Sequence, residues 1–135
     1  MAESEGGAER RRYERFYVDE APVELRRGGL ISLLGLGRIR GGVVNLSEGG
    51  IRVAVPSRLP SRKTVRCQLR TERFQDPLEA VGEVLWCERD LMSEKGFLVG
   101  ILFRDLEPRH ARKIMAMREW YASPEVKARM AARYA

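Results

Sequence analysis

The sequence NLSEGG at residues 45–50 separates two apolar runs and decides how the middle of the chain folds. Two valines at 43–44 precede it, and Ile51, Val53 and Val55 follow it with the two-residue period of a half-buried strand. Asparagine, serine and glycine favour tight turns, because the first two bond locally to the backbone and glycine tolerates unusual backbone angles. The stretch therefore predicts a turn between two β-strands.

Further strands are predicted on both sides of this turn. Alternating apolar residues predict strands at 22–26 and 65–69, and longer ones at 78–86 and 97–103. The glycine-rich apolar run at 28–42 predicts a long hairpin loop or, alternatively, a strand extension packed on the core. Six or so short strands at this spacing predict a mainly β protein built as a small antiparallel β-barrel.

The C-terminal region is predicted to be helical. Pro108 suits the first turn of a helix that starts near 105–107. Arg118 interrupts its apolar face, which is formed by Ala111, Ile114, Met115, Met117 and Tyr121. Ser123 is predicted to cap a second, short helix. We expect the first helix to close the barrel and the second to pack on its own domain, on a second copy or on a partner.

Length and composition fit one domain, since 135 residues can bury one core but not two. Residues 1–9 are predicted to form a disordered tail, 10–121 the barrel with its closing helix, and 122–135 a helical extension. No stretch approaches the roughly 20 apolar residues of a membrane helix. The polar start of the chain is unlike a secretory signal, so the expected location is cytoplasmic, without membrane insertion.

Catalytic and metal chemistry have few candidate residues. His110 is the single histidine, and it falls on the predicted helix as a surface or packing residue. Cys67 and Cys87 stand singly in apolar runs, which predicts reduced, half-buried thiols without a metal. The chain has no phosphate-binding loop of the Walker type. We therefore expect no catalytic residue, no metal site and no cofactor, and the protein is not expected to be an enzyme.

A cluster of arginines lies near the N-terminus, in the sequence RRRYER at residues 10–15. The chain has a net charge of +6, and the planar fork of arginine can hold a phosphate or a guanine edge at two points. Asn45 supplies an amide and Ser47 a hydroxyl, while Gly49 and Gly50 lack the β-carbon that would keep a flat base away. Taken alone, the arginine cluster also fits a solvated basic tail, and residues 45–50 also fit a hairpin turn that binds no ligand.

The two motifs together resemble the PilZ domain family of cyclic di-GMP receptors. Arg11-x-x-x-Arg15 and Asn45-x-Ser47-x-x-Gly50 stand in the family's order and at its spacing. Asparagine 45 departs mildly from the pattern, because the family often has aspartate there. Asparagine keeps an acceptor and loses the charge, which puts the strength of ligand binding in doubt.

The resemblance continues beyond these motifs and covers roughly residues 9–121. The sequence GEVLW at 82–86 is similar to a late strand of the family, and GFLVGILF at 96–103 to its final strand. The sequence DLEP at 105–108 is similar to the entry of its closing helix. The resemblance therefore implies a six-stranded antiparallel β-barrel with a C-terminal α-helix.

The resemblance also implies roles for particular residues. Arg11 and Arg15 would grip guanine and phosphate, and the opposing wall would be formed by Asn45, Ser47 and Gly50. Family members that bind an intercalated ligand dimer often have an arginine just before the paired arginines. Arg10 stands at that place here, so two nucleotides per protein are expected. Arg12 and Trp86 can add edge contacts.

The predicted function is a stand-alone cyclic di-GMP receptor that signals to an unidentified protein partner, with a homodimer through the C-terminal helices as a further expectation. One alternative is a nucleotide-independent adaptor of the same fold, against which the retained motif residues argue. The other is a small basic barrel that binds RNA or single-stranded DNA. Such surfaces need exposed aromatic residues for base stacking, and the strand aromatics here are few: Trp86, Phe97 and Phe103.

Overall fold

The computed structural model describes residues 14–18, 21–27, 37–71, 73–91 and 96–134. Within these ranges the chain is mainly β, as predicted. The strands are β1 (Phe16–Tyr17), β2 (Pro22–Arg27), β3 (Arg38–Ser47), β4 (Gly50–Val55), β5 (Thr64–Leu69), β6 (Leu78–Arg89) and β7 (Phe97–Arg104). Two helices follow, α3 (Pro108–Ala122) and α4 (Pro124–Tyr134).

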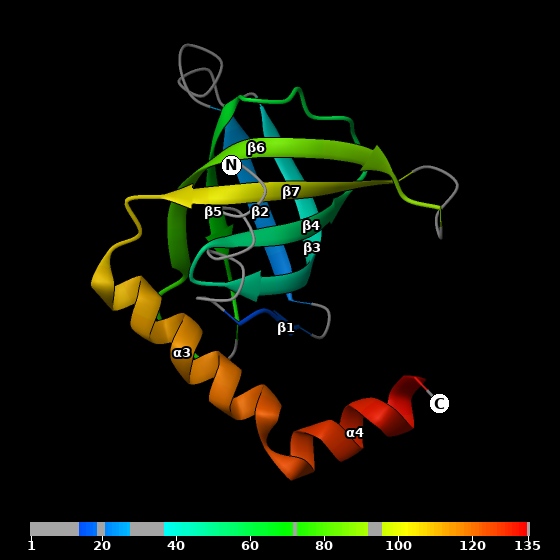
Figure 1. Cartoon of the computed structure of the whole chain (residues 1–135), viewed down its shortest axis with the longest axis vertical. Helices are drawn as coiled ribbons and strands as arrows, with labels where there is room; N and C mark the ends of the chain where they lie inside the picture. Colours follow the sequence, from blue (N-terminus) through cyan, green and yellow to red (C-terminus); the bar gives the residue numbers. More distant parts are fainter. Residues whose placement is uncertain (1–13, 19–20, 28–36, 72, 92–95, 135) are drawn as a thin grey trace, which may run out of the picture.

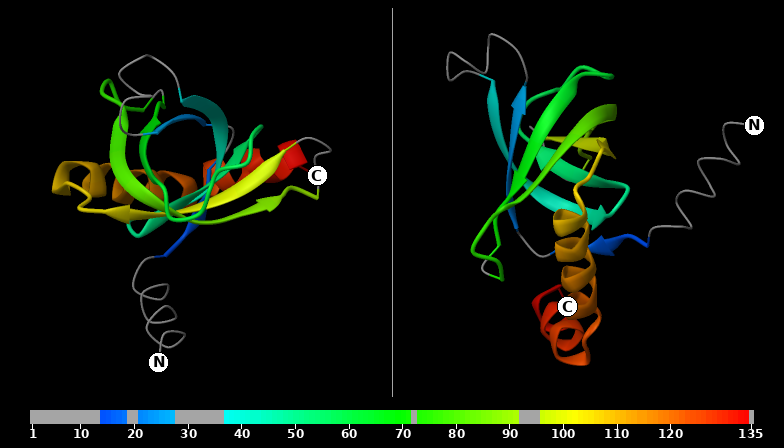
Figure 2. Two further views of the ribbon diagram at one scale, coloured as in Figure 1. Left: turned by 90° about the horizontal axis from the view of Figure 1, so that it is seen from above. Right: turned by 90° about the vertical axis from the view of Figure 1, so that its left-hand side faces the viewer.

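Six of the strands close into an antiparallel barrel (Figure 1). Their order around the ring is β3-β2-β5-β6-β7-β4, and β4 pairs back with β3 to complete it. The short strand β1 pairs with residues 45–46 of β3, beyond the part of β3 that pairs with β2. Seen from above, the strands curve around a common interior and both helices lie beneath them (Figure 2). The predicted six-stranded barrel with C-terminal helices is confirmed.

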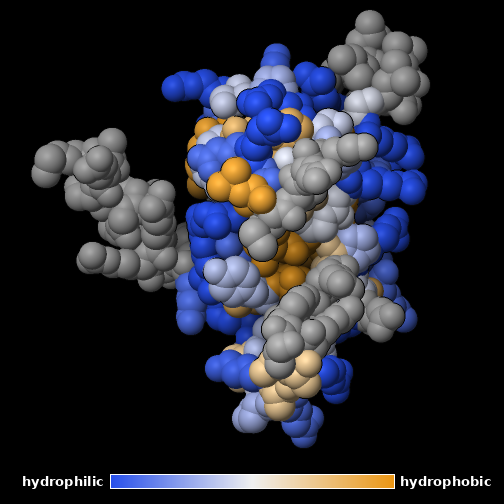
Figure 3. Space-filling model, turned by 90° about the vertical axis from the view of Figure 1, so that its right-hand side faces the viewer, coloured by the Kyte–Doolittle hydropathy of each residue, from blue (hydrophilic) through white to orange (hydrophobic). Residues whose placement is uncertain are grey.

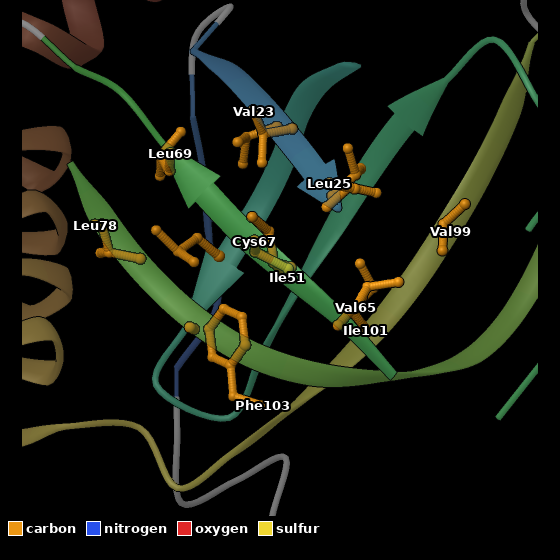
Figure 4. Close-up of a cluster of buried hydrophobic side chains, with 14 of the residues drawn as sticks. Val23, Leu25, Ile51, Val65, Cys67, Leu69, Leu78, Val99, Ile101 and Phe103 are labelled. Carbon is orange, nitrogen blue, oxygen red and sulfur yellow. The ribbon is translucent and has the colours of Figure 1, made fainter. Parts of the chain in front are cut away.

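The core fills the barrel, because alternate residues of each strand face inward (Figure 4). Helix α3 adds Ile114 and Met117, both of which are fully buried. Each large apolar side chain contributes about 1.5–3 kcal/mol when it is removed from water. The inward-facing residues of the strands include Val23, Leu25, Ile51, Val65, Leu69, Leu78, Val99, Ile101 and Phe103.

Both cysteines are free thiols, as expected, but they differ in burial. Cys67 was predicted to be half-buried, and it is fully buried in the barrel interior. Burial raises the pKa of the Cys67 thiol to about 12. Cys87 is half-buried as predicted, and its sulfur accepts a bond from the backbone N–H of Leu59 at 3.5 Å.

The helix ends follow the predicted signals. Pro108 occupies the first turn of α3, and the Oγ of Ser123 accepts a hydrogen bond from the N–H of Val126 at 3.4 Å at the start of α4. The apolar face differs in one residue, because Met115 is 50% exposed. His110 is buried on that face instead.

Several predictions concern segments outside the described residues. These are the tail at 1–9, the residues Arg10–Arg12 and most of the glycine-rich run, at 28–36. Residues 38–42 of that run belong to β3. For this part, the predicted strand extension is correct and the predicted hairpin loop is not. The division between the domain and its extension at 121–122 stays a prediction. No helix in the described part of the chain has the length and apolar content to cross a bilayer.

His110 joins α3 to the barrel. Its Nδ1 accepts a hydrogen bond from the backbone N–H of Glu79 at 3.3 Å. The side chain is buried, and burial lowers the pKa of His110, with the positive charges of Lys113 and Arg109 lowering it further. Glu107 and Glu79 act in the opposite direction and do not outweigh these effects. The neutral ring, which is the form that can accept this bond, is therefore favoured.

We expect acidification to destabilise the fold through His110. Because the pKa of His110 is lower in the folded state, the unfolded chain binds a proton first as the pH falls below about 6.5. The stabilisation is complete above that pH and is lost toward the folded-state pKa. His110→Gln removes the titration, so the fall in Tm between pH 7 and pH 5 should be smaller than in the unchanged protein. Equal falls in Tm would contradict this assignment.

Candidate functional site

A β-bulge in β3 turns the side chains of Asn45 and Ser47 outward. Val44 is an extra residue that has no counterpart on β4, because the pairing register shifts there. One extra residue reverses the alternation between the two faces of a strand. Leu46 therefore packs in the core, while Asn45 and Ser47 lie on the outer side, where they are 6% and 2% exposed. The Asn45 amide has no hydrogen-bond partner among the described residues.

The turn after β3 is held by one hydrogen bond within itself and one from β7. The Oγ of Ser47 accepts a bond from the N–H of Gly49 at 3.1 Å, and the Gly49 carbonyl accepts one from the N–H of Phe103 at 3.0 Å. Gly50 is buried at the start of β4, and a β-carbon there would lie 2.3 Å from the carbonyl oxygen of Ile101. Gly50 therefore has a structural reason to be glycine, whether or not a ligand binds.

Strand β1 brings the arginine segment beside this turn. Residues 16–17 pair antiparallel with 45–46, and continuing the register places Arg15 next to Ser47. Arg15 is exposed. Of the predicted arginines, Arg10–Arg12 lie outside the described residues. The structure thus brings the last arginine of one motif beside the polar residues of the other.

Arg118 of α3 connects both motifs to the helix. Its guanidinium binds the two carboxylate oxygens of Glu48, with Nη1 donating to Oε2 at 3.1 Å. Its Nη2 and Nε also donate to the backbone carbonyl of Glu14, at 2.8 and 3.2 Å. Sequence reasoning missed this network, because Glu48 and Glu14 are 70 and 104 residues away from Arg118. The sequence did show that Arg118 interrupts the apolar face of the predicted helix, which marks it as a residue with a polar partner.

An aromatic cluster supports the same junction. The guanidinium of Arg118 lies 5.5 Å from the centre of the Phe16 ring. The rings of Phe16 and Tyr121 are 5.9 Å apart, and Tyr121 meets Trp120 edge to face at 4.7 Å. Contacts of this kind stabilise by about 0.5–1.5 kcal/mol each. Strand β1 is therefore attached to α3 as well as to β3.

Trp86 reaches the outer face from β6, where a second bulge inserts Leu85. The ring lies against β7, since a β-carbon on Gly100 would be 2.3 Å from it. Arg52 of β4 stands on the other side of Gly100 and places its Cζ 5.1 Å from the centre of the Trp86 ring. Arg52 pairs in turn with Asn45 of β3. The predicted site residues of β3 and β6 are thereby linked across the outer face.

Two of the cavities on the described surface have volumes of about 260 and 90 Å³. Neither is lined by Asn45, Ser47 or Trp86. On the face drawn in Figure 3, hydrophobic residues show in a central hollow and in a second group above it, and hydrophilic residues cover much of the remaining described surface. No group of three potential metal ligands occurs within the described ranges. The candidate site offers a guanidinium, an amide and a hydroxyl, which suit the binding of a polar ligand.

The PilZ domain profile matches residues 9–119. The match covers most of the sequence, and the chain belongs to the PilZ domain family. The family resemblance inferred from the two motifs is therefore confirmed. A search of the curated proteins found no match.

Solved structures show the same fold at low sequence identity. The PilZ domain of YcgR from Escherichia coli, solved with c-di-GMP, has a TM-score of 0.65 and 16% identity over 93% of this chain and 99% of that one. The inhibitor of motility MotI/DgrA from Bacillus subtilis has a TM-score of 0.65 and 16% identity over 85% of this chain and 53% of its own.

A third similar structure is the MrkH–c-di-GMP complex of Klebsiella pneumoniae, with a TM-score of 0.61 and 16% identity. The match covers 80% of this chain and 50% of that one. This chain therefore spans about half the length of the MrkH and MotI/DgrA chains. At this level of identity, the likeness describes the fold.

Proposed function

We propose that this protein is a receptor for cyclic di-GMP and that it acts by binding, without catalysis. The observation that carries the proposal is the pairing of β1 with β3, which, with its register continued, sets Arg15 beside Ser47 on the strand that also carries Asn45. The solved structures of the YcgR domain and of MrkH contain this nucleotide, which supports the choice of ligand.

The chemistry of the ligand matches these side chains. Cyclic di-GMP presents two phosphates, and each guanine offers O6 and N7 as adjacent acceptors for an arginine fork. In this proposal Arg11 and Arg15 bind phosphate and guanine from one side. Asn45 and Ser47 bind from the barrel, where the Asn45 amide lacks a partner among the described residues and the Ser47 hydroxyl can still donate its proton.

The remaining predicted residues have secondary roles in the proposal. Gly49 and Gly50 shape the turn, and Arg12 and Trp86 make edge contacts. Arg10 binds a second nucleotide intercalated with the first. These roles rest on the family motif and on the position of Trp86 on the outer face.

A connection between the site and the helices supports a switching role. Ligand that draws residues 10–15 onto the barrel acts on Glu14, whose carbonyl is held by Arg118. Arg118 also binds Glu48 in the motif turn, so α3 contacts both sides of the site. We propose that α3 and α4 carry the change to a protein partner or to a second copy of the chain.

Titration calorimetry with cyclic di-GMP tests the ligand assignment. We expect binding at micromolar ligand, with a molar ratio of two nucleotides per protein if an intercalated dimer forms. Cyclic di-AMP is the control, because it keeps both phosphates and lacks the O6 acceptor of guanine. Folded protein that gives no heat with cyclic di-GMP would overturn the proposal and favour a nucleotide-independent adaptor.

A further inference from the structure

Arg52 is a half-buried arginine on the outer face of the barrel, without a carboxylate partner in the described part of the chain. Its Nε is enclosed by protein and has no hydrogen-bond partner among the described residues. Leaving a charged donor enclosed and unsatisfied costs free energy. A native structure that retains such a group calls for an explanation, and an acceptor supplied by a ligand is one.

The neighbours of Arg52 show why it does not find a carboxylate within the site. The NLSEGG turn contains one carboxylate, Glu48, which Arg118 already binds. Some outward-facing arginines of the barrel do have an acidic partner, as in the pairs Arg26–Glu24 and Arg104–Glu83. Arg52 instead lies over the ring of Trp86.

The position of Arg52 is fixed by one row of paired residues that crosses five strands. Arg52 stands between Asn45 of β3 and Gly100 of β7, with Tyr17 of β1 and Trp86 of β6 at the two ends. Gly100 allows the Trp86 ring to lie across β7 toward β4. The guanidinium therefore sits within the same wall as the Asn45 amide.

We infer that Arg52, held on Trp86, is a further ligand-contacting residue, an inference that rests on the proposed function. Its free donors bind acceptor atoms of the cyclic dinucleotide, either phosphate oxygens or the O6 and N7 atoms of guanine. The cation–π contact with Trp86 restricts the guanidinium before the ligand arrives. Arg52 is thus a fixed arginine on the barrel, complementary to the arginines that precede β1.

The test compares Arg52→Ala and Arg52→Lys with the unchanged protein by calorimetry with cyclic di-GMP. We expect Arg52→Ala to weaken binding about 10- to 100-fold, and Arg52→Lys to recover part of the loss because it keeps the charge but not the fork. Arg58→Ala is the matched control, since Arg58 lies 5.0 Å over the ring of Phe97 on the same barrel. It should leave the affinity unchanged. Thermal unfolding of each variant verifies the fold.

Trp86 gives a second readout. In a Trp120→Phe background its fluorescence is observed alone, and we expect cyclic di-GMP to change the emission with Arg52 present. The change should be smaller with Arg52→Ala. An affinity and an emission change that are the same in Arg52→Ala as in the unchanged protein would overturn the inference, yet leave the proposed function standing.

Titration with cyclic di-AMP identifies the bound atoms. A loss of affinity for both ligands in Arg52→Ala assigns the contact to phosphate, and a loss for cyclic di-GMP alone assigns it to guanine; either result supports contact. Unchanged protein that binds neither ligand would overturn the proposed function and this inference together. The two failures are therefore distinguishable.

Discussion

Replacing Arg15 by alanine is expected to lower the affinity for cyclic di-GMP by about 30-fold or more, since a lost bidentate arginine contact costs about 2–3 kcal/mol. Arg15 is exposed and precedes β1, so the barrel should keep its stability. Calorimetry measures the affinity, and thermal unfolding shows whether the fold is intact. A loss of affinity without a fall in Tm is the expected combination.

The control for this experiment is Arg70→Ala. Arg70 is an exposed arginine after β5, and it lines the cavity of about 260 Å³ away from the candidate site. This variant removes the same unit of charge, so it separates a local contact from the general attraction of a basic protein for an anion. Equal losses of affinity in the two variants would contradict a specific role for Arg15.

Gly50→Ala is expected to destabilise the barrel by about 2–3 kcal/mol, because overpacking a tight interior has costs of this size. The new β-carbon would lie 2.3 Å from the carbonyl oxygen of Ile101, a backbone atom that cannot rotate away. The strands β4 and β7 would have to separate where they pair. Denaturant unfolding measures the effect as a lower midpoint.

Gly42→Ala provides the comparison, because a β-carbon at Gly42 meets no atom within 4 Å. We expect its unfolding midpoint to stay close to that of the unchanged protein. Similar midpoints for the Gly50 and Gly42 variants would show that the close approach at Gly50 is not limiting. Unfolding must be measured before ligand affinity is interpreted. Weak binding by an unfolded Gly50→Ala variant would reflect the loss of the fold and would not show that Gly50 contacts the nucleotide.

Much of the fold could be predicted because most of the strands carry a local signal, although the short β1 was not predicted. Val23 and Leu25 alternate with charged residues, and Pro108 marks a helix start that the structure reproduces. The two bulges could not be predicted, because Val44 and Leu85 are apolar residues that fit either face of a strand. Their effect is large, since each reverses which side chains face the core.

The candidate site was predictable only where its residues form a motif. Arg15, Asn45 and Ser47 were predicted from the resemblance to the family's motifs, and the pairing of β1 with β3 brings the two motifs together. Arg118 and Arg52 were not found, because their roles depend on contacts between distant segments. In the sequence, Arg52 is an outward-facing residue of an alternating strand, which is typical of an ordinary solvated charge.

The link from Arg118 to Glu14 and Glu48 has a practical consequence for engineering. Arg118 of α3 binds both the segment before β1 and the motif turn, so α3 is coupled to the proposed nucleotide site. A fluorophore attached at the exposed Lys127 of α4 would lie outside the proposed site. It would still belong to the pair of helices that Arg118 connects to that site. If the proposed function holds, the protein can therefore serve as an optical biosensor whose reporter does not contact the nucleotide.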